Sequence, residues 1–166
     1  MPRTKPNIII TGTPGVGKSC HCEHLAQITE LGLKHLSINH IAKERNCYDG
    51  YDDELKSHMI DEDKLLDEIE DEVKEGGYII DWHILLLCYV RIRPFYMIDW
   101  RNGEYKKLQE NLDAEIMQVI LEEAREAYDE EAIIELRSDT TEEIDSNVDR
   151  ISAWTRHWIQ NNPEGV

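Results

Sequence analysis

The sequence has no long apolar run. No stretch approaches the roughly 20 apolar residues that a membrane span needs, and the first six residues do not form the apolar segment of a signal peptide. The four cysteines, Cys20, Cys22, Cys47 and Cys88, do not follow the regular spacing of a disulfide framework. We therefore expect a soluble intracellular protein with reduced thiols and no contact with a membrane.

Basic residues are scarce. Lys and Arg number 18 against 35 Asp and Glu, so the net charge is −17. Such a surface repels phosphate backbones, and we expect no direct binding of nucleic acid. A basic protein, such as a ribosomal or histone-like protein, fits this charge as a partner, although many enzymes are acidic as well. The 166 residues contain no repeat, low-complexity tract or linker, so we expect a single domain over 1–166.

The sequence has no complete set of ligands for a structural metal. Cys20, His21, Cys22 and His24 lie close together, but a second ligand pair is missing. Helical spacing places Cys22 on the inner face of the helix and leaves His21 and His24 on other faces. The many acids between residues 49 and 75 lack the glycine-bearing loop of an EF-hand, and their spacing is typical of a solvated helix face.

Short apolar runs alternate with amphipathic segments. The pattern predicts strands over 7–11, 35–38, 78–82 and 132–136. Helices are predicted from Lys18 to about Glu30, after Asn39 as an N-cap, over 108–127, and after Asp139 or Thr140 as an N-cap. Another is predicted where Leu65, Leu66, Ile69 and Val73 share an apolar face, and it ends at Gly76-Gly77. This order favours an α/β fold, in which right-handed crossovers place helices on both faces of a parallel sheet.

Two segments do not follow this alternation. Residues 48–52 are rich in Asp and Gly, which predicts a turn or loop. Residues 84–100 contain two apolar runs that Arg91, Arg93 and Pro94 separate, with no helical crossover between them. Pro94 forbids one uninterrupted central strand over this segment.

Residues 12–19 match the P-loop pattern G-x-x-x-x-G-K-[ST], and they lie between a β-branched strand and a helix. Glycines let backbone N–H groups surround phosphates, and the helix N-terminus adds partial positive charge. Lys18 is expected to reach the β- and γ-phosphates, and the Ser19 hydroxyl to bind magnesium. The motif predicts a P-loop NTPase that binds ATP and Mg²⁺.

Further candidates follow from what phosphoryl chemistry requires. Asp81, at the end of a predicted strand, can hold magnesium through a bound water molecule. His83 can position water or relay a proton, or it can be an inert loop residue. An arginine is needed to neutralise charge on the transferred group, and Arg91, Arg93 and Arg101 are candidates that spacing does not separate.

Together with the P-loop, several later segments resemble the adenylate kinase isoenzyme 6 family, the coilin-interacting nuclear ATPase. These segments are 48–52, 61–63, 80–83, 108–123 and 147–149. The resemblance implies an adenylate-kinase-like fold with an AMP-binding segment at about 37–60 and a lid at about 100–110. It also implies adenylate kinase and ATPase activities, and help in maturing small-subunit ribosomal RNA in nucleus and cytoplasm. That help comes partly from binding a small-subunit ribosomal protein.

The resemblance also assigns roles to residues. The implied catalytic residues are Lys18, Asp81, His83 and Arg101. The implied ATP-binding residues are Gly12, Thr13, Gly15, Val16, Gly17, Lys18, Ser19, Cys20 and Arg101. AMP binding is implied for Asn39 and Lys43, and magnesium binding for Ser19 and Asp81.

Four departures from the family pattern leave alternatives open. Cys20 stands where the family usually has a hydroxyl residue, Lys43 where it usually has an arginine, and Thr140 where it often has a lysine. The stretch between His83 and Arg101 is shorter than in the family and has no recognisable fourth strand. The leading hypothesis is an enzyme that transfers the γ-phosphoryl group to AMP or water. One alternative is a kinase for another nucleoside monophosphate. Another is a nucleotide-dependent assembly factor with little or no catalysis, which the shortened stretch favours.

Overall fold

A computed structural model of the chain describes most of the sequence. The described residues are 2–12, 17–52, 57–82, 95–100, 119, 121–126 and 128–165, with the backbone alone at 52, 57 and 95–100. Of the predicted helix over 108–127, residues 119 and 121–126 are described and are helical. The predicted lid beyond residue 100 lies outside the described ranges. Among the described helices, none combines the length and apolar character required to cross a membrane.

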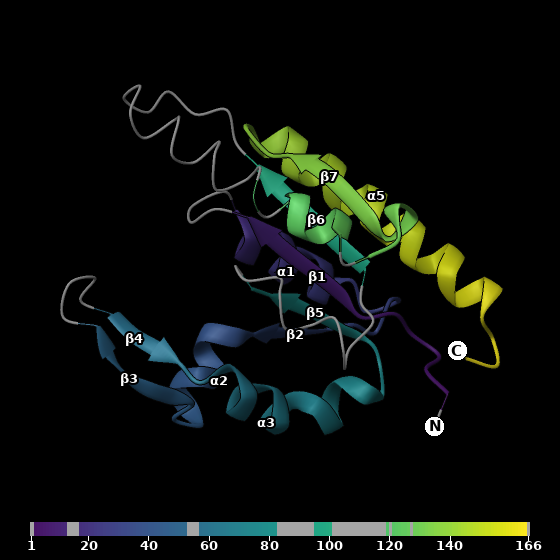
Figure 1. The fold of residues 1–166 in the computed structure, drawn as a ribbon. Coiled ribbons are helices and arrows are strands. Elements are labelled where there is room, and N and C mark those ends of the chain that lie inside the picture. The colour runs from purple at the N-terminus through teal and green to yellow at the C-terminus, as the bar shows by residue number, and fades with distance from the viewer. Residues whose placement is uncertain are drawn as a thin grey trace.

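Five parallel strands form the central sheet, in the spatial order β2-β5-β1-β6-β7 (Figure 1). They are β2 (Lys34–Ser37), β5 (Tyr78–Asp81), β1 (Ile8–Gly12), β6 (Phe95–Trp100) and β7 (Ile133–Arg137). Every residue of β1 is buried, as its β-branched run without polar alternation predicts. The predicted parallel sheet is therefore confirmed for these strands.

Helices cover both faces of the sheet, so the domain has three layers. On one face, α1 (Lys18–Gln27) and α5 (Thr141–Asn161) pack against Ile8, Ile10 and Ile79. On the other face, α2 (Ile38–Glu44) and α3 (Glu62–Lys74) pack against Ile9, Leu36 and Ile80. A short 3₁₀ turn, η1 (Glu130–Ala132), precedes β7. Alternate residues of each strand therefore belong to different cores, as the two-residue period of a strand requires.

Strand β6 supplies a strand between His83 and Arg101, where the sequence showed no recognisable fourth strand. It begins at Phe95, directly after Pro94, and lies between β1 and β7 in the middle of the sheet. Because the proline precedes the strand, it removes no hydrogen-bond donor from the ladder that Phe95 to Asp99 form with β1. The sheet therefore keeps the member that the shortened stretch called into question.

A correction concerns residues 48–52, which were predicted to be a turn. They form β3 (Tyr48–Asp52), which pairs antiparallel with β4 (Ser57–Ile60) in a hairpin beside α2 (Figure 1). The ring of His58 lies 4.8 Å from that of Tyr48 and 5.1 Å from that of Tyr51, centroid to centroid. Contacts between aromatic side chains on paired strands offset the turn preference of Asp and Gly.

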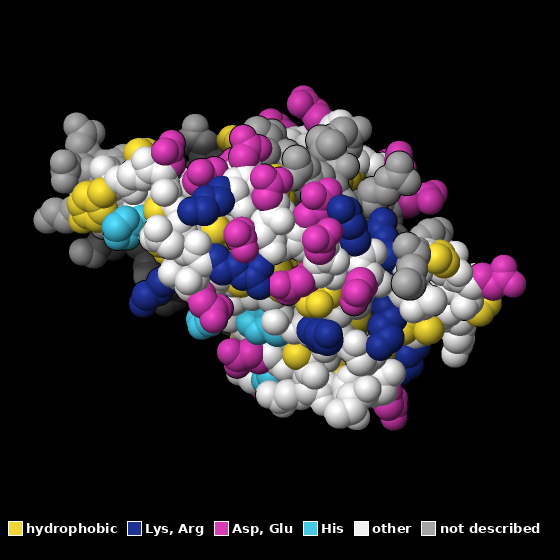
Figure 2. Space-filling model, turned by 90° about the horizontal axis from the view of Figure 1, so that it is seen from below, with side chains coloured by type: hydrophobic (Ala, Val, Ile, Leu, Met, Phe, Trp, Pro, Cys, Tyr) yellow, Lys and Arg dark blue, Asp and Glu magenta, His cyan; other side chains and the backbone are white. Residues whose placement is uncertain are grey.

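Helix α3 confirms the predicted amphipathic pattern. Leu65, Leu66, Ile69 and Val73 are buried, and the helix begins where Asp61 accepts a hydrogen bond from the Lys64 amide at 3.0 Å. Its acids face solvent, which supports a solvated face over a calcium site. On the side of the molecule shown in Figure 2, acidic side chains are spread among lysines and arginines.

Helix α2 differs from the prediction at its start. Asn39 was predicted to be its N-cap, but the helix begins at Ile38 and Ser37 occupies the N-cap position. Asn39 therefore lies in the first turn, where its side chain is exposed. The apolar residue Ile38 is buried, and its burial determines where the helix begins more strongly than the capping preference of Asn39 does.

Asn7 joins the end of α3 to the start of β5, and this connection can be tested. Its buried side chain donates to the carbonyl of Val73 at 2.7 Å and accepts from the amide of Tyr78 at 3.1 Å. Asn7→Ala removes the acceptor of the buried Tyr78 amide and one donor to the Val73 carbonyl, which keeps the Gly76 amide at 3.2 Å. We therefore expect the free energy of unfolding to fall by about 1–3 kcal/mol in urea denaturation. Asn161→Ala, at the exposed end of α5, is the control. Equal stability of the two variants would contradict this role for Asn7.

Candidate nucleotide-binding site

The candidate site lies at the carboxyl edge of the parallel sheet. Strand β1 ends at Gly12 and β5 ends at Asp81, and Ser37 at the end of β2 is in register with Asp81. Open α/β sheets bind their ligands outside the carboxyl ends of the strands. The fold thus brings the predicted ATP-binding and metal-binding segments to the edge where such sheets hold ligands.

The two ends of the P-loop are described, and both support the motif. Gly17 caps α1 with a left-handed φ of 106°, a conformation that favours glycine. The Lys18 ammonium donates to the carbonyl of Gly12 at 2.9 Å. Lys18 therefore reaches from the start of α1 back to the end of β1. The predicted phosphate-binding residues Thr13, Gly15 and Val16 lie outside the described residues.

Ser19 and Asp81, the two predicted magnesium ligands, are in contact. The Ser19 hydroxyl donates to Oδ2 of Asp81 at 2.5 Å, although 62 residues separate them in the sequence. Asp81 is largely buried. A hydroxyl and a carboxylate are hard oxygen ligands, the kind that Mg²⁺ prefers. The residues present therefore fit a magnesium ion at this position.

The other predicted site residues occupy varied places. Cys20 lies on α1 with its sulfur 3.8 Å from Nε2 of His24. Asn39 and Lys43 are exposed on α2, and a spacing of four residues places them on the same side of that helix. Because α2 follows Ser37, it begins at the same edge of the sheet as Asp81. Their role in AMP binding stays a prediction, and His83 and Arg101 lie outside the described residues.

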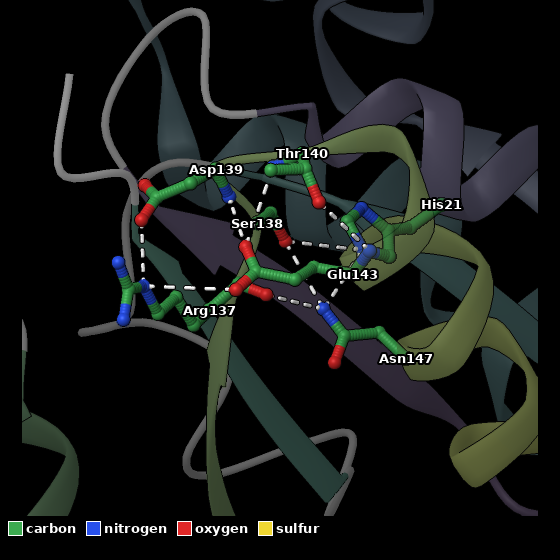
Figure 3. A network of polar contacts seen from close by, with 7 residues as sticks. All are labelled: His21, Arg137, Ser138, Asp139, Thr140, Glu143 and Asn147. Carbon is green, nitrogen blue, oxygen red and sulfur yellow. Dashed lines mark hydrogen bonds and ion pairs between the residues drawn. The ribbon is translucent and has the colours of Figure 1, made fainter.

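His21 is a residue of this region that the sequence reasoning missed. It was expected on an outer face of its helix, but it is fully buried between α1 and the segment after β7 (Figure 3). Its Nδ1 lies 2.9 Å from the Gly17 carbonyl, and its Nε2 lies 3.3 Å from the Ser138 hydroxyl and 3.4 Å from the Asn147 amide nitrogen. A carbonyl only accepts, so Nδ1 carries the proton and Nε2 of the neutral ring is an acceptor.

The segment after β7 is held by further polar contacts. The Asn147 amide nitrogen also lies 2.9 Å from the Arg137 carbonyl and 3.1 Å from the Ser138 hydroxyl, so its two hydrogens face three acceptors. Thr140 caps α5 in a capping box with Glu143, which decides between the two predicted caps. The Arg137 guanidinium donates to Asp139 at 2.6 Å, and this hydrogen bond raises the pKa of Arg137 above its ordinary value.

These contacts make one connected network (Figure 3). Through His21, the carbonyl of the P-loop residue Gly17 is tied to the start of α5. The capping box leaves a local signal in the sequence, Thr140 followed by Glu143 three residues later. The burial of His21 leaves no local signal in the sequence, because its partner Ser138 is 117 residues away.

Comparison with known proteins agrees with this geometry. A family model described as an AAA domain matches residues 8–98, from β1 into β6. Adenylate kinase isoenzyme 6 homolog HBR1 of Candida albicans is 46% identical, covering 99% of this chain and 74% of its own length. The homolog FAP7 of Saccharomyces cerevisiae is 42% identical, covering 99% and 89%. The homolog of Schizosaccharomyces pombe is 41% identical, covering 96% and 97%.

Solved structures agree with the fold. A proposed kinase from Chloroflexus aurantiacus superposes with a TM-score of 0.56 at 17% identity, covering 96% of this chain and 98% of its own. Shikimate kinase from Bacteroides thetaiotaomicron superposes with a TM-score of 0.51 at 13% identity, covering 90% and 97%. At these identities the likeness concerns the fold alone, which is that of the P-loop kinases.

The network around His21 yields a stability prediction. His21→Ala removes the acceptor of two buried donors and the donor to Gly17, so we expect the free energy of unfolding to fall by at least about 1–3 kcal/mol. The matched control is His24→Ala, which changes a half-exposed histidine three residues further along the same helix. Chemical denaturation compares the two variants. A His21→Ala protein as stable as His24→Ala would contradict the network's structural role.

Proposed function

Because the chain belongs to the adenylate kinase isoenzyme 6 family, we propose that it transfers the γ-phosphoryl group of ATP to AMP, and that water also serves as an acceptor. The observation that carries the proposal is the junction of β1, α1 and β5. There Lys18, Ser19 and Asp81 meet at the carboxyl edge of the sheet. A complete P-loop motif links the two described ends of the junction.

Each residue at the junction has a distinct role in this proposal. Lys18 places its ammonium group beside the loop, where it neutralises charge on the β- and γ-phosphates. Ser19 and Asp81 supply oxygen ligands for magnesium, directly or through water. When bound, magnesium offsets negative charge on the phosphates during transfer. Catalysis then depends mainly on positioning and electrostatics, as in other phosphoryl transfers.

The acceptor side of the proposal rests on α2 and the β3–β4 hairpin. These elements fill the segment 37–60, for which AMP binding was predicted, and α2 starts beside the end of β5. We assign Asn39 and Lys43 to AMP on this ground. His83 and Arg101 complete the proposed machinery, as the residue that positions water and the lid arginine. The shortened stretch between His83 and Arg101 favoured a silent binder; the presence of β6 in the sheet, with Lys18, Ser19 and Asp81, supports turnover.

A product assay tests the proposal. Purified protein is incubated with magnesium and ATP, with and without AMP, and ADP and phosphate are quantified. We expect ADP to rise strongly only when AMP is present, with slower release of phosphate without AMP. Lys18→Ala is expected to lower the rate roughly 100-fold or more, since it removes a group that stabilises transition-state charge. Lys74→Ala, at the exposed end of α3, serves as the control. No ADP or phosphate from folded wild-type protein would refute the activity.

We further propose that the protein acts in maturation of the small ribosomal subunit, in nucleus and cytoplasm, by binding a basic small-subunit ribosomal protein. The net charge of −17 supports this partner class. Helix α3 offers a surface of exposed acids, which we call the α3 acidic face. It consists of Asp63, Asp67, Glu68 and Asp71, with Glu75 at the C-cap. Within it Glu68 pairs with Arg45 at 3.7 Å and Asp71 with Lys74 at 3.5 Å, and both acids stay exposed. Direct binding of nucleic acid is not part of the proposal.

Charge reversal tests this partner. The double variant Asp67→Lys, Asp71→Lys changes two residues one turn apart on the α3 acidic face. We expect it to weaken binding to a purified basic small-subunit ribosomal protein roughly tenfold or more, and binding to weaken with added salt. Asp149→Lys, exposed on α5 across the sheet, is the control. Affinity that is equal in both variants and independent of salt would contradict the proposal.

A further inference from the structure

A sulfur, a nitrogen and an oxygen converge beside the candidate nucleotide site. The Cys22 sulfur, an imidazole nitrogen of His35 and a carboxylate oxygen of Asp81 all lie within 4.8 Å of one another. The three residues come from α1, β2 and β5. Cys22 belonged to the cysteine and histidine cluster that lacked further ligands in the sequence. The structure supplies two of them, from strands rather than from its own helix.

The pleat of the sheet explains why these side chains meet. His35 alternates with Leu36, and Asp81 alternates with Ile80. Since Leu36 and Ile80 pack in the core below α2 and α3, His35 and Asp81 belong to the opposite face, which α1 covers. His35 is in register with Ile79, so Asp81 is its diagonal neighbour on the adjacent strand. Cys22 is fully buried on the side of α1 that packs against this face.

One ring nitrogen of His35 lacks a hydrogen bond to the described residues. Its Nε2 is buried and has no hydrogen-bond partner among the described residues. Oδ2 of Asp81 is 4.0 Å away, which is too far for a hydrogen bond. Buried polar atoms are normally paired, and a neutral imidazole nitrogen is a common metal ligand. A cation between His35 and Asp81 would satisfy His35 Nε2 and neutralise charge on Asp81.

We propose that Cys22, His35 and Asp81 form a binding site for zinc. Thiolate, imidazole and carboxylate are the ligands that zinc takes in proteins, whereas magnesium and calcium prefer oxygen alone. Side chains of His35 and Asp81 are 22% and 11% exposed, so an ion can enter from their side. Three protein ligands leave one coordination position for water. On binding, the Cys22 S–H bond gives its proton to solvent and a zinc–sulfur bond forms, with no change of oxidation state.

The thiol of Cys22 lies on the inner side of the site. Cys22 is fully buried and packs in the core with Leu25 and Ile79, whereas the side chains of His35 and Asp81 are partly exposed. The sulfur therefore forms the closed side of the site, and His35 and Asp81 form its open side.

Sharing of Asp81 gives the site a consequence for activity. The same carboxylate contacts Ser19 in the proposed magnesium site. A zinc ion held by Asp81 competes with magnesium there, so zinc inhibits the phosphoryl transfer. This consequence rests on the proposed function, whereas zinc binding itself does not.

Binding is tested on the full-length, metal-free protein without nucleotide. Zinc affinity is measured by competition with a chromophoric chelator, and cobalt serves as a spectroscopic probe of thiolate ligation. Wild-type protein is expected to bind one zinc ion and to show a thiolate-to-cobalt charge-transfer band. Cys22→Ala is expected to abolish the band, and both Cys22→Ala and His35→Asn to weaken zinc at least about tenfold. Cys47→Ala, at another fully buried cysteine, and His24→Asn are the matched controls.

The outcomes separate the metal site from the proposed function. Circular dichroism first establishes that each variant is folded, and His35→Asn decides the matter if Cys22→Ala is not. Absence of zinc binding in wild type, or equal affinity in the Cys22 or His35 variant and its control, overturns the site. If zinc binds as expected but the magnesium-loaded protein transfers no phosphoryl group, the proposed function fails and the zinc site stands. If activity is present, zinc inhibition that is weakened in His35→Asn but not in His24→Asn supports the shared role of Asp81.

Discussion

The candidate site depends on the parallel pairing of β1 with β5. In this register Ile10 lies opposite Asp81, which places the carboxylate beside the start of α1 and within 2.5 Å of the Ser19 hydroxyl. A slip of one residue would turn Asp81 to the other face of the sheet, away from α1. The register is fixed because β1 and β5 are buried on both faces, so a slip would exchange the residues of the two cores. Packing of apolar residues thus sets the position of the polar ones.

Buried polar groups connect helices and strands in addition to this apolar packing. At the amino edge of the sheet, Asn7 connects the end of α3 with the start of β5. At the carboxyl edge, His21 and Asn147 connect α1 with the segment after β7. Hydrogen bonds are directional, so they specify relative placement more narrowly than apolar contact does. The connection through His21 includes the Gly17 carbonyl of the P-loop, where placement matters for binding phosphates.

Local patterns in the sequence predicted the parts of the fold that depend on local physics. The P-loop is contiguous, α3 follows a helical period, and Asp81 ends a short apolar strand, so each was correctly placed. Strand β6 was missed because its position depends on pairing with β1 and β7, which are distant in sequence. The hairpin was missed because Asp and Gly favour turns when the contacts of Tyr48 and Tyr51 with His58 on the paired strand are not considered. For the same reason a helical pattern alone could not show that His21 is buried.

Asp81 lies where two ligand sets of different chemistry meet. With Ser19 it offers only oxygen atoms, which suit magnesium. With Cys22 and His35 it offers oxygen, nitrogen and sulfur, which suit zinc. Because zinc binds most protein ligands more tightly than magnesium does, the choice between the two ions at such a carboxylate depends on how easily the nitrogen and sulfur ligands are reached. Cys22 is fully buried and packs with Leu25 and Ile79, so an ion enters from the partly exposed side of His35 and Asp81. The apolar packing that buries Cys22 therefore also bears on which cation the shared carboxylate holds.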